Sequence, residues 1–234
     1  MCGEREWGGA GGERAAGCGE KKPGSPYRVH PKSFWYYVRC ALFLRPRAAN
    51  LELHGKPTRQ KGEVQMPIET GSFRSIFGTL PTPVAVITAV DGEGNQRGLT
   101  TNTVTALSME PPMLLVCLDE SSTTLPAILD SRFFVVNFLA DSGAGISQTF
   151  AGKADDKFAG LTQRPAARAG GAPVLADDVV AHAECEVHST LRAGDHTIVI
   201  GTVRDGAVHD RAPLMYHRRQ YFRWSPPELA AIGD

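Results

Sequence analysis

The apolar positions from residue 83 onward predict a chain built mainly from β-strands. Short runs rich in β-branched and other apolar residues alternate with clusters of turn residues. Many short strands with few helices favour an antiparallel barrel, closed or partly closed, because closure removes exposed sheet edges. The expected strands cover residues 83–90, 97–107, 113–118, 133–139, 179–188 and 197–203.

Turn and helix signals separate these strands. The segment Asp91–Asn95 (DGEGN) is typical of a hairpin loop, and residues 97–107 are then expected to form the returning strand. Residues 124–129 and 144–150 have the composition of short helices, with Pro126 acceptable because it falls in a first turn.

Residues 1–65 have a different composition from the rest of the chain. They are rich in glycine, carry 12 basic and 6 acidic side chains, and lack a sustained apolar period, whereas residues 66–234 carry 13 basic and 19 acidic side chains. The apolar cluster at 34–44 contains Arg39 and is too short to span a bilayer, so no membrane role is expected. We therefore expect a disordered N-terminal extension or upstream translation over 1–65, and a domain over 66–234 that starts at Met66.

The cysteines favour a reducing compartment. Only Cys117 and Cys185 fall in the expected domain, and the chain contains no CxxC pair. Taken alone, both residues are typical of small buried apolar side chains. A cytoplasmic location is expected.

An ordered set of motifs resembles one known family. The set consists of PTPVAVITA, the block from Gly98 to Asp119, the SSTT segment from Ser121, VNFLA, TFAGK, a Gly-Asp-His turn and the closing PLMYHRRQYF. Over residues 73–224 the chain resembles the flavin reductase-like proteins of the FMN-binding split-barrel fold, especially the reductase partners of two-component flavin monooxygenases. The resemblance implies a mainly β, Greek-key antiparallel split barrel with a few short helices.

The same resemblance implies an activity and its partners. Such a protein uses NADH or NADPH to reduce FMN or FAD and passes the reduced flavin to a transient flavin-dependent monooxygenase. Hydride moves directly between the two cofactors, so the protein needs no acid–base pair or triad. A homodimer is expected, because relatives bind flavin near a subunit interface.

The hydroxyl-rich segment from Thr100 to Thr105 suits a flavin ring edge and ribityl chain, which need hydrogen-bonding groups in an apolar pocket. Without the resemblance, a solvent-facing strand with threonine chosen for its β-propensity is the favoured explanation of the segment. The residues that the resemblance assigns here are Thr100, Thr101, Asn102, Thr103 and Thr105.

The segment Ser121, Ser122, Thr123 and Thr124 precedes the Pro126 helix and forms a natural anion site, where hydroxyls and free N–H groups favour a phosphate. An ordinary helix cap is a compatible alternative. Many relatives carry arginine or lysine just before this segment, whereas this chain has Asp119-Glu120, which leaves the choice between FMN and FAD open.

The Gly-Asp-His turn supplies the candidate catalytic residue. The resemblance places His196 beside the nicotinamide, where an imidazole can orient the carboxamide or supply a proton, with Asp195 next to it. Taken alone, a histidine that starts a strand is more often only a polar end residue. The remaining positions that the resemblance assigns to the flavin or nicotinamide pocket are Cys117, Leu118, Asp119, Asn137, Phe150, Lys153, Phe158 and Tyr221; Phe150 and Phe158 taken alone are typical core residues.

Other function classes find little support. The chain has no HExxH, no GxSxG and no clustered Cys and His at metal-ligand spacing, so no metal site is expected. The Gly143-Ala144-Gly145 sequence resembles a dinucleotide fingerprint but has Gln148 at the third glycine position. The basic, aromatic stretch at 218–224 stands without a wider basic surface, so no nucleic-acid partner is expected. Two rivals remain on the same barrel: a pyridoxamine-phosphate oxidase-like enzyme and a non-catalytic flavin- or haem-binding module.

Overall fold

The structure is a computed structural model that describes residues 68–154 and 156–224. The extension predicted for residues 1–65 lies outside these described residues, as does the apolar cluster at 34–44. The described elements, in chain order, are α3 (Thr70–Gly78), β1 (Thr82–Pro83), β2 (Ala85–Val90), β3 (Gln96–Thr101), β4 (Val104–Met109), β5 (Pro112–Asp119), α4 (Thr124–Ser131), β6 (Phe133–Leu139), the 3-10 turn η1 (Asp141–Gly143), α5 (Ala144–Ala151), β7 (Gln163–Pro165), β8 (Pro173–Leu175), β9 (Val179–Ala193), β10 (His196–Val208), β11 (Leu214–His217) and β12 (Gln220–Arg223).

Seven strands form the main sheet, in the order β3-β2-β6-β9-β10-β5-β4. Every neighbouring pair in it is antiparallel. A three-stranded sheet, β1-β11-β12, and the β7-β8 pair accompany it. The mainly β antiparallel fold and the two helices predicted at 124–129 and 144–150 are therefore confirmed.

The prediction of one strand over 97–107 is wrong. The chain leaves β3 at Thr101 and begins β4 at Val104, and these two strands occupy opposite edges of the seven-stranded sheet. Because Asn102 and Thr103 alone connect them, the two edges can lie no more than about 10 Å apart at this point. The short connection curls the sheet into a barrel whose edges meet without pairing, which is the split of the expected fold.

Two further strand predictions needed correction. The run at 83–90 is divided at Val84, because β1 pairs with β11 while β2 pairs with β3 and β6. The strands predicted at 179–188 and 197–203 continue to Ala193 and Val208. The turn from Gly194 therefore lies at the tip of a long β9–β10 hairpin.

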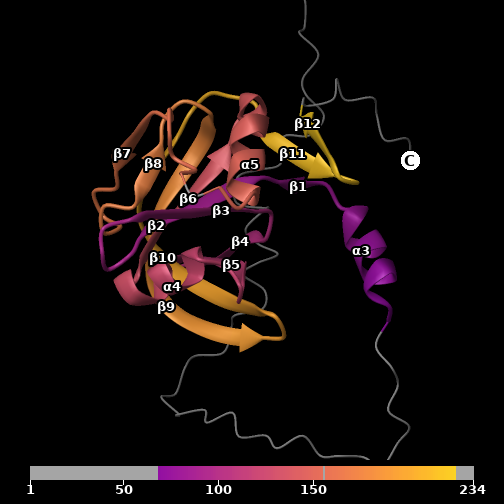
Figure 1. Ribbon diagram of the computed structural model, residues 1–234, viewed down its shortest axis with the longest axis horizontal. Helices are drawn as coiled ribbons and strands as arrows, with labels where there is room; N and C mark the ends of the chain where they lie inside the picture. Colours follow the sequence, from indigo (N-terminus) through magenta and orange to yellow (C-terminus); the bar gives the residue numbers. More distant parts are fainter. Residues whose placement is uncertain (1–67, 155, 225–234) are drawn as a thin grey trace, which may run out of the picture. The chain divides into compact units, whose positions relative to one another are not determined.

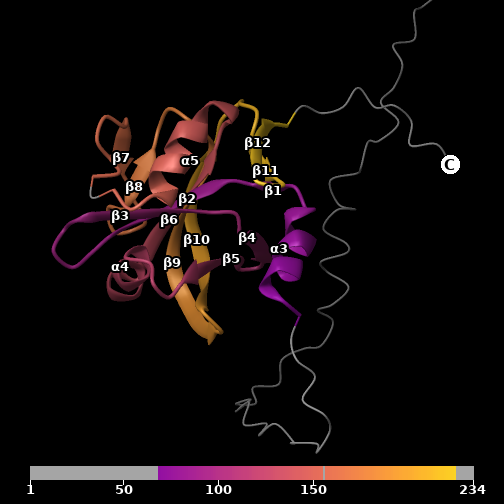
Figure 2. The ribbon, with the colours of Figure 1, turned by 45° about the vertical axis from the view of Figure 1, so that its right-hand side comes forward.

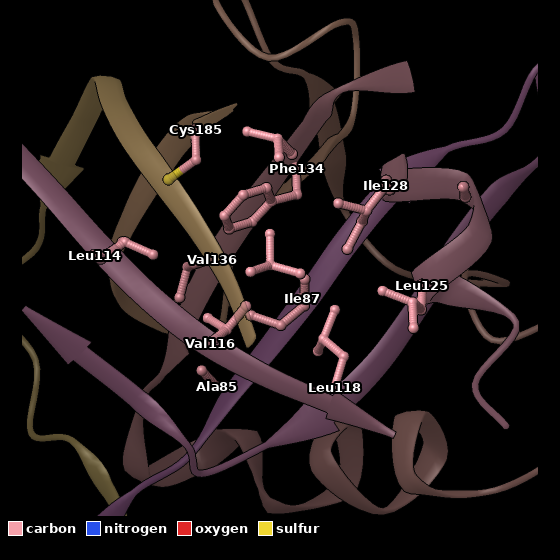
Figure 3. Close-up of a cluster of buried hydrophobic side chains, with 14 residues drawn as sticks. Ala85, Ile87, Leu114, Val116, Leu118, Leu125, Ile128, Phe134, Val136 and Cys185 are labelled. Carbon is pink, nitrogen blue, oxygen red and sulfur yellow. The ribbon is translucent and has the colours of Figure 1, made fainter. Parts of the chain in front are cut away.

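The inner face of the curled sheet holds the main core. Alternate residues of the strands point inward, and Ile87, Val116, Phe134 and Val199 are fully buried together with Ile128 of α4. Figure 3 shows these strands and α4 converging on one apolar cluster.

A close approach in this core requires a glycine. A Cβ atom at Gly201 of β10 would lie 2.6 Å from the ring of Phe134, so a side chain there would displace the aromatic residue.

A second apolar cluster lies under α5. It joins Val86, Leu139, Phe150, Leu175 and Leu214, which come from the main sheet, β8, α5 and β11. In Figure 1 the strands β2 and β3 run between α5 above and α4 below. The two helices thus cover different parts of the sheet.

Helix α3 differs from the other two helices because none of its residues is buried. Figures 1 and 2 show it standing apart from α4 and α5. Across the part of the chain that the structure describes, no helix has the length and apolar character needed to cross a bilayer.

Candidate active site

The outer face of β4, β5 and β10 carries most of the predicted site residues. Side chains on β5 alternate, so that Leu118 is buried in the core while Cys117 and Asp119 face outward. His196 pairs directly with Asp119, and Ile198 pairs with Cys117, so these four residues share one face. Val104 pairs with Val116, which brings the threonine-rich connection beside the same strand.

Hydrogen bonds fix that threonine-rich connection. Thr103 Oγ1 donates to Cys117 O at 2.9 Å and accepts from Cys117 N at 3.2 Å. The hydroxyls of Thr101 and Thr103 lie 2.8 Å apart, and Asn102 Nδ2 donates to Thr82 Oγ1 at 3.0 Å. Residues 102 and 103 thus form an ordered connection between two strand ends, within what the sequence predicts as one strand over 97–107. Thr105 is exposed on β4.

The loop after β5 is organised by Asp119. Its carboxylate Oδ1 accepts from both the backbone N–H and the hydroxyl of Ser121, at 2.7 Å each. Ser122 Oγ accepts from the Thr124 N–H at 3.0 Å at the start of α4, which leaves its hydroxyl hydrogen available to a ligand. The loop therefore presents Ser122 and Thr123 in front of the helix N-terminus.

The Gly194–His196 turn lies next to that loop. Gly194 has a φ of 66°, a left-handed conformation that glycine adopts without strain. The Glu120 N–H donates to Asp195 O at 3.0 Å, and His196 Nδ1 lies 2.8 Å from Asp195 Oδ1. The loop expected to hold the flavin phosphate and the turn expected to face the nicotinamide are thus in direct contact.

The electrostatics of this corner fix the orientation of His196. Hydrogen bonds from Ser121, together with the neighbouring His196, lower the pKa of Asp119, and the hydrogen bond with His196 lowers the pKa of Asp195. Because an ionised Asp195 can only accept, Nδ1 of His196 must carry the proton in this pair. Nε2 is then the ring nitrogen left to meet a ligand.

A second set of predicted residues lies beneath α5, away from the outer face. Thr100 Oγ1 donates to Ser147 O at 2.7 Å, and the Tyr221 hydroxyl lies 2.9 Å from Ser147 Oγ. Phe150 is buried, and its ring meets that of Phe158 edge-on with centroids 4.9 Å apart. These contacts hold α5 against β3.

A lysine to which no motif was assigned, Lys157, anchors α5, while the pocket role of Lys153 stays a prediction. Lys157 Nζ donates to Gly98 O at 3.2 Å and to Phe150 O at 3.1 Å, and its partial burial lowers its pKa. Lys153 is exposed. Lys157 lies four residues beyond the TFAGK motif, so no motif in the sequence marks it.

Besides Phe150, three predicted residues lie inside the protein. Leu118 and Thr124 belong to the buried interior, and Asn137 is completely buried, with its amide bonded to Val86 O, Thr88 Oγ1 and the Leu175 N–H. The Asn137 amide is engaged by the fold, and the structure does not bring these three side chains to the outer face with His196.

The chain is similar to proteins of known activity. Residues 77–225 match the family model described as flavin reductase like domain. The chain is 45% identical over 170 residues to a flavin reductase (NADH) of Kitasatospora aureofaciens, which covers 70% of this chain and 88% of that protein. It is 34% identical to the reductase subunit of a flavin-dependent monooxygenase from Rhodococcus jostii, over 66% of this chain and 77% of that subunit.

A solved structure supports the same similarity. The NADH:FAD oxidoreductase of Streptomyces globisporus C-1027, in complex with NAD and FAD fragments, superimposes with a TM-score of 0.65 at 27% identity, covering 71% of this chain and 99% of that one. The family match extends over more than half of the chain and includes β1 to β12. On this match and these identities, the chain belongs to the flavin reductase-like family.

Proposed function

We propose that this chain, an NAD(P)H-dependent flavin reductase by its family and its 45% identity to an NADH-dependent relative, binds both of its ligands on the outer face of β4, β5 and β10. The observation that carries the proposal is the direct contact between the Asp119–Thr123 loop and the Gly194–His196 turn. Two segments far apart in the sequence thereby form one corner with free polar groups.

The groups at this corner fit a phosphorylated, hydroxylated ligand. Ser122 keeps its hydroxyl hydrogen for an acceptor, and it stands at the N-terminus of α4, where helix polarity favours an anion. Thr124 Oγ1 is buried and lacks a hydrogen-bond partner among the described residues. On this proposal, Ser122 and Thr123 hold the flavin phosphate, while Thr101 and Thr103 meet the ribityl chain and ring edge.

The outer face also offers apolar contact to a flat ring. Leu115, Cys117 and Ile198 are half-buried there, between the threonines and His196. When bound, the flavin supplies the redox chemistry by accepting a hydride from the nicotinamide. The side chains of this surface orient the two ring systems and exclude water from between them.

His196 is the proposed nicotinamide contact. With Nδ1 donating to Asp195, Nε2 can bind the carboxamide or move a proton. Asp195 therefore acts as the residue that holds the imidazole.

The reduced flavin is proposed to leave for a partner enzyme. The similarity to a monooxygenase reductase subunit supports a transient flavin-dependent monooxygenase partner and an exchanging flavin. A cytoplasmic location, where such partners meet in a reducing environment, remains part of the proposal.

A homodimer is proposed from the exposed apolar side chains of α3. Phe73, Ile76 and Phe77 are each more than half exposed, and the two aromatic rings lie 4.7 Å apart. An amphipathic helix with no buried residue needs a partner surface. A second copy of the chain is the proposed cover, and Phe77→Glu should convert the dimer to a monomer in light scattering; a monomeric wild type would contradict it.

The activity test measures NADH and NADPH oxidation with FMN, with FAD and without added flavin. A flavin reductase oxidises nicotinamide only when flavin is present, and the four combinations reveal its preferences. A pyridoxamine-phosphate oxidase-like enzyme or a non-catalytic flavin- or haem-binding module would show no flavin-dependent oxidation.

A further inference from the structure

Glu120 connects the two halves of the candidate site. Its backbone N–H donates to Asp195 O at 3.0 Å. Its carboxylate Oε1 accepts a hydrogen bond from Thr197 Oγ1, and Oε2 lies 3.6 Å from Arg192 Nε. One residue of the loop after β5 thus contacts three residues of the β9–β10 hairpin.

The contacts with Arg192 and Thr197 lie on either side of the Gly194–His196 turn. Arg192 on β9 and Thr197 on β10 are directly paired across the hairpin, two residues from Gly194 on one side and one residue from His196 on the other. The Glu120 carboxylate therefore holds both strands at the base of the turn, while its N–H holds the turn itself.

The contact with Thr197 is the strongest of the three on physical grounds. Thr197 is 7% exposed, and its hydroxyl donates to a charged acceptor, a class of hydrogen bond stronger than a neutral one. Arg192 is 74% exposed, so its ion pair with Glu120 contributes little. Loss of the carboxylate would leave the buried Thr197 hydroxyl without this acceptor.

Glu120 is also part of the Asp119–Thr123 loop, which forms the other half of the site. It stands between Asp119, which organises the loop, and Ser121, whose N–H and hydroxyl Asp119 binds. A displacement of the loop is therefore transmitted to the turn through Glu120.

Resting on the proposed function of this corner, we infer that Glu120 is a positioning residue, which fixes His196 relative to the Asp119–Thr123 loop and so couples nicotinamide orientation to flavin binding. Glu120 acts through Asp195, Thr197 and the turn, and touches neither ligand. Its loss should slow hydride transfer more than it weakens flavin binding.

The test compares Glu120→Ala, Glu120→Gln, Thr197→Val and the Glu120→Ala/Thr197→Val double variant of the full chain. Glu186→Ala is the matched control, because Glu186 forms a half-exposed ion pair with Arg204 on the same two strands, away from the turn. The measurements are the rate constant of anaerobic flavin reduction at saturating nicotinamide and the flavin Kd.

Glu120→Ala and Thr197→Val should each slow reduction about 10-fold, with flavin Kd changed less than about twofold, because misplacement of an orienting group affects reactive geometry more than binding. The double variant should be no slower than either single variant, since both remove one contact. Glu120→Gln keeps an acceptor for Thr197 and should retain most of the rate. A Glu120→Ala protein that reduces flavin as fast as Glu186→Ala overturns the inference.

A second readout is independent of activity. Amide hydrogen exchange at Asp195, His196 and Thr197 should be faster in Glu120→Ala than in Glu186→Ala, in protein without ligands. A wild-type chain without reductase activity would refute the proposed function, while the exchange comparison would still decide whether Glu120 holds the turn. Equal exchange in the two variants would refute that holding role.

Discussion

Two polar side chains of this protein, Asn137 and His196, were predicted to line the same pocket, yet they lie in opposite environments. Asn137 is fully buried between β2, β6 and β8, with both amide atoms bonded to groups of the fold. His196 stands on the outer face of the sheet, where Asp195 binds one ring nitrogen and the other has no hydrogen-bond partner among residues 68–154 and 156–224.

The difference separates polar groups that stabilise the fold from polar groups that can bind a ligand. A buried amide must be satisfied internally, because an unmet hydrogen bond in the interior is costly. A half-exposed imidazole with one fixed nitrogen loses little by leaving the other to solvent. Burial and partner count, more than residue type, therefore indicate which positions act on substrates.

The largest expected effect is on stability, from Asn137→Ala. The substitution leaves the Leu175 N–H without its acceptor and opens a small cavity, at a cost of about 3 kcal/mol in the free energy of unfolding. Urea denaturation measures it, and Gln148→Ala, at an exposed position of α5, should cost less than about 0.5 kcal/mol. The reduction rate of folded Asn137→Ala protein should stay near the wild-type value; a strong loss of rate without a loss of stability would return Asn137 to the site.

His196→Ala should show the opposite pattern. If the imidazole orients the nicotinamide, kcat/KM for NAD(P)H should fall about 10- to 100-fold, or about 1.4 to 2.8 kcal/mol of transition-state stabilisation, with flavin Kd and stability little changed. His188→Ala is the control, because His188 is an exposed histidine of β9. Rates of anaerobic reduction and flavin titrations test the division; a wild-type rate, or a failure to bind flavin, would contradict the assigned role.

Ser122→Ala should weaken flavin binding while leaving nicotinamide use nearly unchanged. Removal of one hydroxyl that meets a charged phosphate should raise flavin Kd by about 5- to 10-fold, near 1 kcal/mol. The variant should also lose a little stability, because Ser122 accepts the Thr124 N–H at the start of α4. Ser131→Ala, at the other end of α4, controls for that loss, and an unchanged Kd in Ser122→Ala would remove Ser122 from the phosphate site.

The smallest expected effect is a pH dependence of stability from the interior. Burial, with a smaller contribution from Arg164, lowers the pKa of His182 below its ordinary value of 6.5, so the folded protein favours the neutral ring. Below pH 6.5 the unfolded chain binds more protons at this residue, and stability should decline as the pH falls. Thermal melting across this range should show a weaker decline in His182→Gln; an unchanged slope would show that another group is responsible.

How well each element could be predicted depended on whether local sequence patterns or contacts between distant segments define it. The strands at 113–118 and 133–139 and both short helices follow from local apolar patterns and turn residues, and the structure has them. The strand predicted over 97–107 failed at Asn102, because a run of β-formers carries no information about which neighbour each half pairs with. The pairing of β3 with β2 and of β4 with β5 is decided by contacts distant in the sequence.

The sequence by itself determined the family, the β-rich pattern and the segments that contain the candidate site, since motif order and apolar alternation are written locally in the chain. Only the tertiary structure decided that Asn137 is buried against β8, that Lys157 anchors α5, and that Glu120 reaches Thr197. The Glu120–Thr197 contact, for example, depends on the register of β5 against β10, and register is fixed by the joint burial of side chains from neighbouring strands.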